Sequence, residues 1–572
     1  MKYVSILIAG LFIWQCISPI SNTPAAISEQ ELFDHISFLA SDSLEGRKPG
    51  TPQSKQAANY IANHFKKLGL SPLGENGFQY LDVVTAVNLG RENSFIAGDI
   101  ETLPGENYTP LVFSANTTLD AGLAFVGYGF QIENDTVQWD DYAQQETDGK
   151  WVMILRGNPE NAASHSKYDN VSALRHKILV ARDNGAQGVI FVSGSKFDAK
   201  DDLMDLNIDR NFSMAALPVL HVKRNLADQL IMESGISIDS LEANIDQHLK
   251  PHSFVLDIKL EITTDVVQQE VTTQNIISLL PGSDPVLKDE YILIGAHYDH
   301  LGWGGKGSGS RKPDLHEIHN GADDNASGVA AVLEIAERLA LGKTPLKRSV
   351  IFMAFAAEEM GLLGSKFFTS NALIDLKQVK QMFNLDMVGR MNPETLSLTI
   401  GGTGTGLGLE EFLMTRAEGN PMTLSTTPDG YGPSDHSSFY IEDIPVLFFF
   451  TGITEEYHTP ADDIETINIA GEKLIADFAY ELIKDIATME STFKYQEAGP
   501  KAPPQGGKRG KVKMGIIPDF AAADANGFLL AGVVPGGPAA FAGMQKGDVM
   551  ISIEGRSIKN IYDYMGRMAE VK

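Results

Sequence analysis

The second half of the chain alternates between short apolar runs and stretches in which apolar residues recur every three or four positions. Apolar runs of this length predict strands that are buried on both faces, and the helical spacing predicts helices that cover them. The predicted strands are Tyr291–Ala296, Ser349–Ala356, Gln381–Leu385 and Ile444–Phe450, and the helices include Gly328–Leu341 and Lys473–Ile486. The pattern predicts an α/β fold with a mostly parallel central sheet flanked by helices.

Two amphipathic helices are predicted ahead of these strands. Ser28 and Glu31 have the spacing of a capping box, and the apolar residues after them recur at helical spacing as far as Leu39. A second helix carries apolar residues from Ala57 to Leu68.

Residues 106–262 have a pattern of their own. A strand at residues 149–157 ends in a glycine turn, a helix follows through Leu174 and Ala181, and further strands are predicted at residues 185–192 and 217–220. This succession resembles the protease-associated (PA) domain, a small module inserted into several peptidase families. The alternative is that these elements continue the main α/β domain.

The first 26 residues are typical of an export signal. Lys2 precedes the apolar run Val4–Trp14, which is too short to span a bilayer. The only cysteine, Cys16, lies in this segment, so disulfides and cysteine catalysis are excluded from the mature protein. We expect an exported protein, periplasmic or extracellular, with no transmembrane segment once mature. The alternatives are a buried N-terminal strand and a lipid anchor on Cys16, which the bulky Trp14 and Gln15 before it disfavour.

Charge excludes one class of partner. Acidic residues outnumber basic ones 74 to 46, which gives a formal net charge of −28. Because phosphate contacts need clustered lysine and arginine, we expect no nucleic-acid partner.

Five segments place a metal-type ligand at or just after the end of an apolar element. Each residue alone has a plain structural explanation, such as a helix cap or a hydrogen-bonded histidine. Together, five charged or imidazole groups at apolar strand ends need a partner, and a pair of metal ions would supply it. The candidate ligands are His297, Asp324, Glu359, Asp386 and His458.

The order His-x-Asp, Asp-Asn-Ala-Ser-Gly, Glu-Glu, Asp-Met-Val-Gly, Tyr-His-Thr resembles the dizinc exopeptidase family, which includes bacterial secreted leucine-type aminopeptidases and glutamate carboxypeptidase. The resemblance makes residues 27–105 and 263–490 the two parts of a catalytic domain with a phosphorylase/hydrolase-like zinc peptidase fold. It implies two Zn²⁺ ions, for which Mn²⁺ or Co²⁺ could substitute. Asp324 would bridge them, with His297 and Asp386 on one ion and Glu359 and His458 on the other.

The resemblance also implies further roles. Glu358 would be the general base that acts on a hydroxide-forming water between the metals. Asp299 would orient the ring of His297, and Tyr431 would stabilise the oxyanion, although a packed loop tyrosine is the alternative. The peptide bond after Asp324 is expected to be cis. His300, close to the ligands in sequence, would help position the substrate or serve the structure.

These features predict a zinc-dependent exopeptidase that removes N-terminal residues from peptides. A carboxypeptidase or dipeptidase of the same family is the alternative, since no decisive determinant of the recognised peptide end is visible. Alternatives of another class are a non-catalytic, receptor-like binding protein and a scaffold built on the C-terminal unit.

A linker rich in proline, glycine and lysine is predicted at residues 491–511, and a separate unit follows at residues 512–572. The glycine turn at Met514–Ile516 and the run Gly547–Gly555 resemble a bacterial PDZ domain, which implies binding of peptide C-termini by strand addition. The last strand or two of such a domain are missing after residue 570, so an incomplete PDZ domain is expected.

Overall fold

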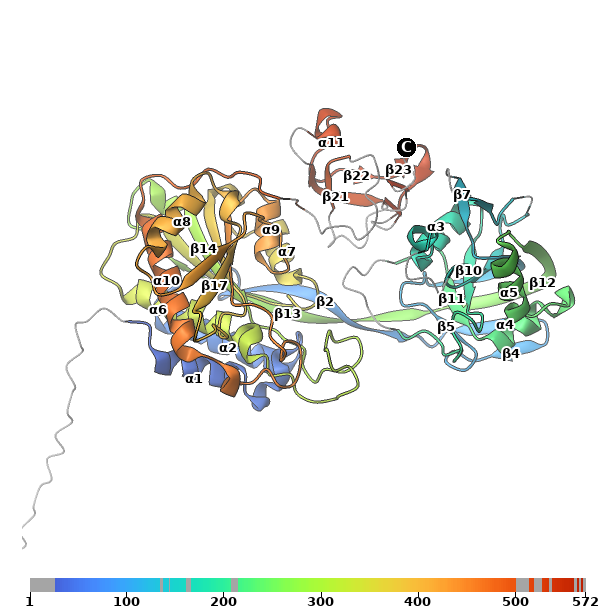
Figure 1. The fold of residues 1–572 in the computed structure, drawn as a ribbon, viewed down its shortest axis with the longest axis horizontal. Helices are drawn as coiled ribbons and strands as arrows, with labels where there is room; N and C mark the ends of the chain where they lie inside the picture. The colour runs from blue at the N-terminus through green and yellow to red at the C-terminus, as the bar shows by residue number, and fades with distance from the viewer. Residues whose placement is uncertain are drawn as a thin grey trace, which may run out of the picture.

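The computed structural model describes residues 26–133, 137–143, 145–160, 166–206, 214–499, 501, 514–518, 527–533, 537–559, 563–564 and 567–568. The predicted export signal up to residue 25, with Cys16, lies outside these residues, and so do residues 502–511 of the predicted linker. Within the described part of the chain, no helix is both long and apolar enough to traverse a membrane. Figure 1 shows two sheet-containing bodies joined by a long two-stranded ribbon.

The main sheet has nine strands in the order β1-β13-β15-β14-β16-β19-β17-β18, with β2 paired to β13. The four central strands, β15, β14, β16 and β19, are parallel to one another. Their bounds are β14 (Tyr291–His297), β15 (Ser349–Phe355), β16 (Val379–Leu385) and β19 (Val446–Phe450), and the flanking strands are β1 (Ser71–Pro72), β2 (Phe78–Leu89), β13 (Val266–Leu280), β17 (Ser397–Gly401) and β18 (Thr423–Thr426).

The flanks of this sheet correct the prediction of a mostly parallel sheet. β13 runs antiparallel to β15, and β17 runs antiparallel to β19, so the sheet is mixed around a parallel centre. β2 and β13, along which the chain leaves the main domain and returns to it, also pair antiparallel. The apolar pattern of residues 291–450 predicted only the centre.

Helices cover both faces of the main sheet. Ile292 and Ile294 of β14 pack into a core with four of these helices, while Leu293 between them packs against two helices on the other face. This alternation explains why the central strands are apolar at every position. The first face carries α1 (Glu29–Leu39), α2 (Pro52–Lys67), α6 (Gly328–Leu341) and α10 (Ile469–Thr488), and the second carries α7 (Leu363–Ser370) and α9 (His436–Ile441). Ser28 caps α1 as predicted, accepting a hydrogen bond from the Glu31 amide at 3.3 Å.

The second body is built on an eight-stranded sheet in the order β4-β3-β12-β6-β9-β10-β11-β5. Because β3 and β4 precede residue 106, this sheet begins earlier in the chain than the predicted PA boundary. Its elements are β3 (Ser94–Ala97), β4 (Ile100–Thr102), β5 (Tyr108–Pro110), β6 (Thr117–Val126), β9 (Trp151–Leu155), β10 (Gly188–Val192), β11 (Val219–Val222) and β12 (Ser253–Thr264), with α3 (Leu174–Asp183), α4 (Arg224–Leu230), α5 (Ile238–His248) and the small hairpin β7 (Gln131–Glu133) with β8 (Gln138–Asp140). The resemblance to a PA domain stays a prediction.

The C-terminal unit contacts both bodies. Lys546 Nζ lies 2.9 Å from Glu442 Oε1 next to α9, and Arg182 Nη2 of α3 lies 2.7 Å from Asp563 Oδ2. Its described elements are β20 (Ile516–Pro518), β21 (Phe528–Val533), α11 (Pro538–Phe541), β22 (Val549–Met550), β23 (Ser552–Ile553) and β24 (Arg556–Ser557). Only four residues of the helix predicted at 561–570 are described, and the PDZ assignment stays a prediction.

Candidate metal centre

The predicted ligands converge at the carboxyl edge of the parallel strands. His297 is the last residue of β14, and Asp386 follows directly after β16. Glu358 and Glu359 follow β15, and His458 lies in the loop after β19. Asp324 comes from the short helical turn Ala322–Ser327 ahead of α6, and its peptide bond to Asn325 is cis, as predicted.

Asp324 lies between two half-sites. His297 Nε2 is 3.2 Å from Asp324 Oδ1 and 3.4 Å from Asp386 Oδ1. On the other side, His458 Nε2 is 3.2 Å from Asp324 Oδ2 and 3.1 Å from Glu359 Oε2. Each oxygen of one carboxylate therefore faces a different histidine.

These separations fit metal ligands. Two ligands of a tetrahedral Zn²⁺, each at roughly 2.0–2.2 Å from the ion, stand about 3.3–3.6 Å apart. The set of imidazoles and carboxylates suits Zn²⁺, and the Asp386 Oδ1 atom is buried without a hydrogen-bond partner among the described residues. The residues present therefore fit a pair of zinc ions that share Asp324.

Buried acids behind the ligands hold the loops that carry them. The Asp299 carboxylate accepts hydrogen bonds from the backbone amides of Glu358 at 3.0 Å and Glu359 at 3.4 Å. Asp299 also lies behind His297, but the closest contact of His297 Nδ1 is the Asp299 carbonyl oxygen at 3.2 Å, against 4.0 Å for the carboxylate. The predicted orienting contact is thus made by the main chain, and the carboxylate sets the position of the Glu358–Glu359 loop.

Sequence reasoning missed two residues around the centre. The Asp462 carboxylate accepts hydrogen bonds from the backbone amides of Asp323 at 2.9 Å and Asp324 at 3.0 Å. The only signal for it in the sequence was its position four residues after His458. Arg47, which is 1% exposed, donates to the carbonyl oxygens of Tyr298 at 2.7 Å and Asn320 at 2.6 Å, and so ties the His297 and Asp324 loops together. Nothing in the local pattern around Arg47 indicates this contact.

His300, which was expected to help position the substrate or serve the structure, contacts a predicted ligand. Its Nδ1 atom is 2.8 Å from Glu359 Oε1 and 3.8 Å from Asp324 Oδ2. Among the described residues, the spacing of ligand atoms gives two groups that could hold a metal ion: His297 with Asp324 and Asp386, and His300 with Asp324 and Glu359. His458 and His300 therefore both lie against the second half-site.

The two neighbouring glutamates have opposite electrostatic environments. Burial raises the pKa of Glu358 well above its usual value, and the charge of Glu359 adds to this shift. Burial and Asp324 also act to raise the pKa of Glu359, but hydrogen bonds from His300 and His458 outweigh them and lower it to about 2. A pair of carboxyl groups with divided pKa values is typical of sites that separate an acid–base group from a charged ligand.

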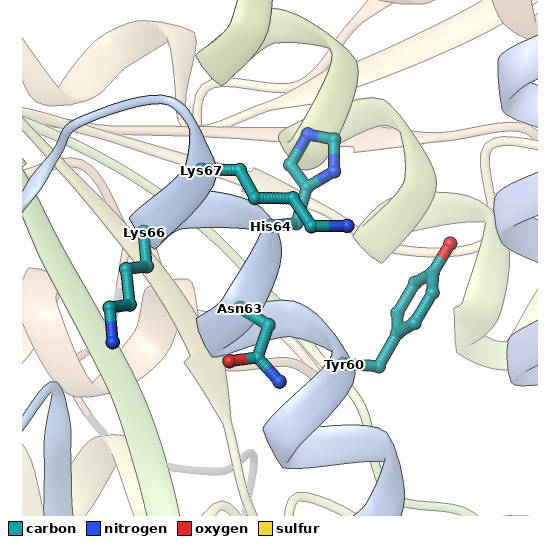
Figure 2. Close-up of a pocket in the computed structure, with 5 residues that line it drawn as sticks. All are labelled: Tyr60, Asn63, His64, Lys66 and Lys67. Carbon is teal, nitrogen blue, oxygen red and sulfur yellow. The ribbon is translucent and has the colours of Figure 1, made fainter.

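Tyr431 lies apart from the ligands. It is partly buried and packs against the core on the α7 and α9 face of the sheet, and burial raises its pKa. Among the described residues no hydrogen bond joins it to the centre, so its predicted oxyanion role stays a prediction. A surface pocket also lies elsewhere: Tyr60, Asn63, His64, Lys66 and Lys67 of α2 line it, and none is a predicted site residue (Figure 2).

Comparisons with known proteins find relatives of the segment that contains this centre. Residues 275–483, which carry every predicted ligand, match the model of Peptidase family M28. Aminopeptidase YwaD from Bacillus subtilis is 27% identical over 492 residues, 81% of this chain and 90% of that protein. A probable leucine aminopeptidase from Arthroderma otae is 30% identical over 224 residues, 36% of this chain, which spans about half (56%) of that relative's length.

Among solved structures, a zinc aminopeptidase from Bacillus subtilis covers 83% of this chain and 98% of its own at 23% identity, with a TM-score of 0.45. That structural similarity is too low to carry a functional argument. The matched peptidase segment and the relatives named as aminopeptidases support the predicted enzyme class, a metallo-aminopeptidase that hydrolyses peptide bonds.

Proposed function

We propose that this protein is a dizinc aminopeptidase that removes N-terminal residues from peptides. The observation that carries the proposal is the position of Asp324, whose two carboxylate oxygens each lie 3.2 Å from a different histidine. A carboxylate that served only as a helix cap would not be expected to lie between two imidazoles. The relatives that match this chain are named as aminopeptidases, which favours the N-terminal end of the peptide over the C-terminal end.

His297, Asp324 and Asp386 would hold one zinc ion, and Asp324, Glu359 and His458 the other. The ions, when bound, would polarise the peptide carbonyl and lower the pKa of a coordinated water toward neutrality. His297 and His458 would be held in the ligating orientation because their Nδ1 atoms contact the carbonyl oxygens of Asp299 at 3.2 Å and Gly309 at 3.0 Å. Imidazoles fixed in this way present Nε2 to a metal.

Glu358 would move the proton. Its carboxyl side chain is not used by any of the hydrogen bonds that hold the ligand loop, and its backbone amide is fixed by Asp299. The raised pKa suits a group that takes a proton from the attacking water and passes it to the leaving amine. Tyr431 is retained as the proposed oxyanion donor, which requires its hydroxyl to approach bound substrate.

The test combines metal analysis of the purified protein with a peptide panel. We expect about two zinc ions per chain, and hydrolysis of peptides with a free N-terminus that a chelator abolishes and added Zn²⁺ restores. Peptides acetylated at the N-terminus should resist cleavage, whereas C-terminal amidation should have little effect. Cleavage of the acetylated set alone would replace the aminopeptidase with a carboxypeptidase, and a protein free of zinc in zinc-containing buffer would remove the proposal altogether.

A further inference from the structure

Among the described residues, His300 makes the shortest side-chain contact to a predicted ligand. Its ring is fully buried, and Nδ1 lies 2.8 Å from Glu359 Oε1. As a ligand in the proposed zinc centre Glu359 is a carboxylate, and a carboxylate can only accept a hydrogen bond. The hydrogen at His300 Nδ1 is therefore donated to Glu359.

The two oxygens of Glu359 face different partners. Oε1 is held by His300, while Oε2 lies 3.1 Å from His458 Nε2, the spacing expected across a metal ion. A glutamate side chain that is free to rotate could present either oxygen, or both. The contact with His300 removes that freedom.

The His300 ring is itself held in place by close packing. A Cβ atom on Gly321 would come within 2.6 Å of two ring atoms, so only glycine leaves room for the imidazole. The ring of His458 stands edge-on to it with 5.8 Å between centroids. His300 Nε2 is buried and has no hydrogen-bond partner among the described residues, so Nδ1 is the nitrogen that this packing puts to use.

We propose that His300 is a positioning residue for the second zinc ion. By donating its Nδ1 hydrogen to Glu359 Oε1, it turns Oε2 alone toward His458 and the ion that these two residues share. The proposal rests on the proposed function, because it presupposes the zinc pair. It assigns His300 to the surroundings of one ion only: the other ion's ligands His297 and Asp386 make no contact with it in the described structure.

The two half-sites should respond differently when the donor is removed. Loss of a residue that holds a metal ligand typically weakens metal binding 10- to 100-fold. We expect this loss for the ion at His458 and Glu359, while the ion at His297 and Asp386 keeps its affinity. The protein would then keep one ion at its wild-type affinity and bind the other more weakly than the wild type does.

Three variants of His300 distinguish the loss of its hydrogen-bond donor from the loss of the shape of its ring. His300→Phe keeps a ring without the donor, and His300→Ala removes both. His300→Asn keeps a donor, because its Nδ2 is attached through Cγ as the imidazole Nδ1 is. Zinc content is measured by dialysis against buffers of fixed free Zn²⁺ concentration. The Phe and Ala variants should lose one ion of two at Zn²⁺ levels that keep the wild type full, and Asn should restore the second ion to within a few-fold of wild type.

Matched controls are His221→Phe and His221→Asn, which replace a buried histidine of the second sheet and report the cost of such a change to folding. Thermal unfolding of each variant shows that the zinc is measured on folded protein, and the Ala variant serves if Phe does not fold. Two retained ions in the Phe and Ala variants would overturn the proposal. Equal loss in Asn, Phe and Ala would also overturn it, since it would make the ring nitrogen a ligand. A wild-type protein without zinc would instead refute the proposed function.

Discussion

His297 and His221 occupy similar places in two different sheets. Each is buried, 1% and 0% exposed, and each belongs to a strand that is part of four consecutive parallel strands. Burial lowers the pKa of His221 to about 3. Burial also acts against the charge on His297, but the neighbouring carboxylates, Asp386 first among them, raise its pKa well above the usual value.

The difference lies in what surrounds each strand end. Beside the second sheet, the buried Lys177 Nζ donates to two main-chain carbonyl oxygens, those of Leu155 and Gly157, both at 2.7 Å. In the main sheet, the carboxylates of Asp324, Glu359 and Asp386 lie within 3.1–3.4 Å of the imidazoles of His297 and His458. In both bodies, parallel strands end at a common edge of the sheet. The buried carboxylates at the edge of the main sheet are what distinguish the candidate metal centre from the second sheet.

The largest effect is expected from removing the Asp324 carboxylate, which the two half-sites share. Asp324→Ala should cost both zinc ions and all detectable peptidase activity, because each ion loses a ligand at once. Zinc content after dialysis and turnover of a free peptide are the readouts. Retention of one ion would mean that Asp324 serves a single half-site, and the bridging geometry would have to be abandoned.

A smaller effect is expected from changing the group that moves the proton. Glu358→Gln keeps the shape of the side chain but cannot accept a proton, so kcat should fall by roughly 10²–10⁴-fold. Zinc content should stay at the wild-type level, because Glu358 is not a ligand in the proposed arrangement. A variant with near wild-type turnover would exclude Glu358 as the base, and one without zinc would make it a ligand.

The sequence predicted the ligands better than their surroundings, for a physical reason. Strand ends such as Ala296 and Leu385 are marked by local apolar runs, and parallel pairing brings them to one edge wherever the strands lie. Contacts that depend on distant segments leave no local pattern. Arg47 donates to carbonyl groups more than 250 residues away in the sequence, so it was not assigned to this centre. The ribbon of β2 and β13 has the polar surface of an exposed hairpin, so its strands were not assigned to the main sheet.

The second sheet provides the converse experiment. Lys177→Met removes the donor to two buried carbonyl oxygens and should cost about 1–3 kcal/mol of stability for each. Zinc content and kcat should be unchanged in the molecules that remain folded, since the residue lies in the other body. Denaturant unfolding measures the loss, and a drop in zinc content at full folding would show that the two sheets are coupled.

The mildest prediction concerns pH and uses the contrast between the two histidines. His221 stays neutral in the folded protein until the pH reaches about 3, and the Met204 amide donates to its Nδ1 at 3.3 Å, whereas an unfolded histidine takes up a proton near pH 6.5. Between these values the unfolded state binds more protons, so stability must fall as the pH falls, by at most about 1.4 kcal/mol per pH unit for this residue.

His221→Asn keeps an acceptor for the Met204 amide and does not titrate. The difference in unfolding free energy between wild type and variant should therefore shrink as the pH is lowered from 6.5 toward 4, and stay constant above pH 7. Denaturant unfolding at several pH values, on zinc-free protein so that ligand protonation does not contribute through metal loss, measures that difference. If that difference in unfolding free energy is independent of pH, His221 is charged or exposed in the folded protein. The contrast drawn between His221 and His297 would then be wrong.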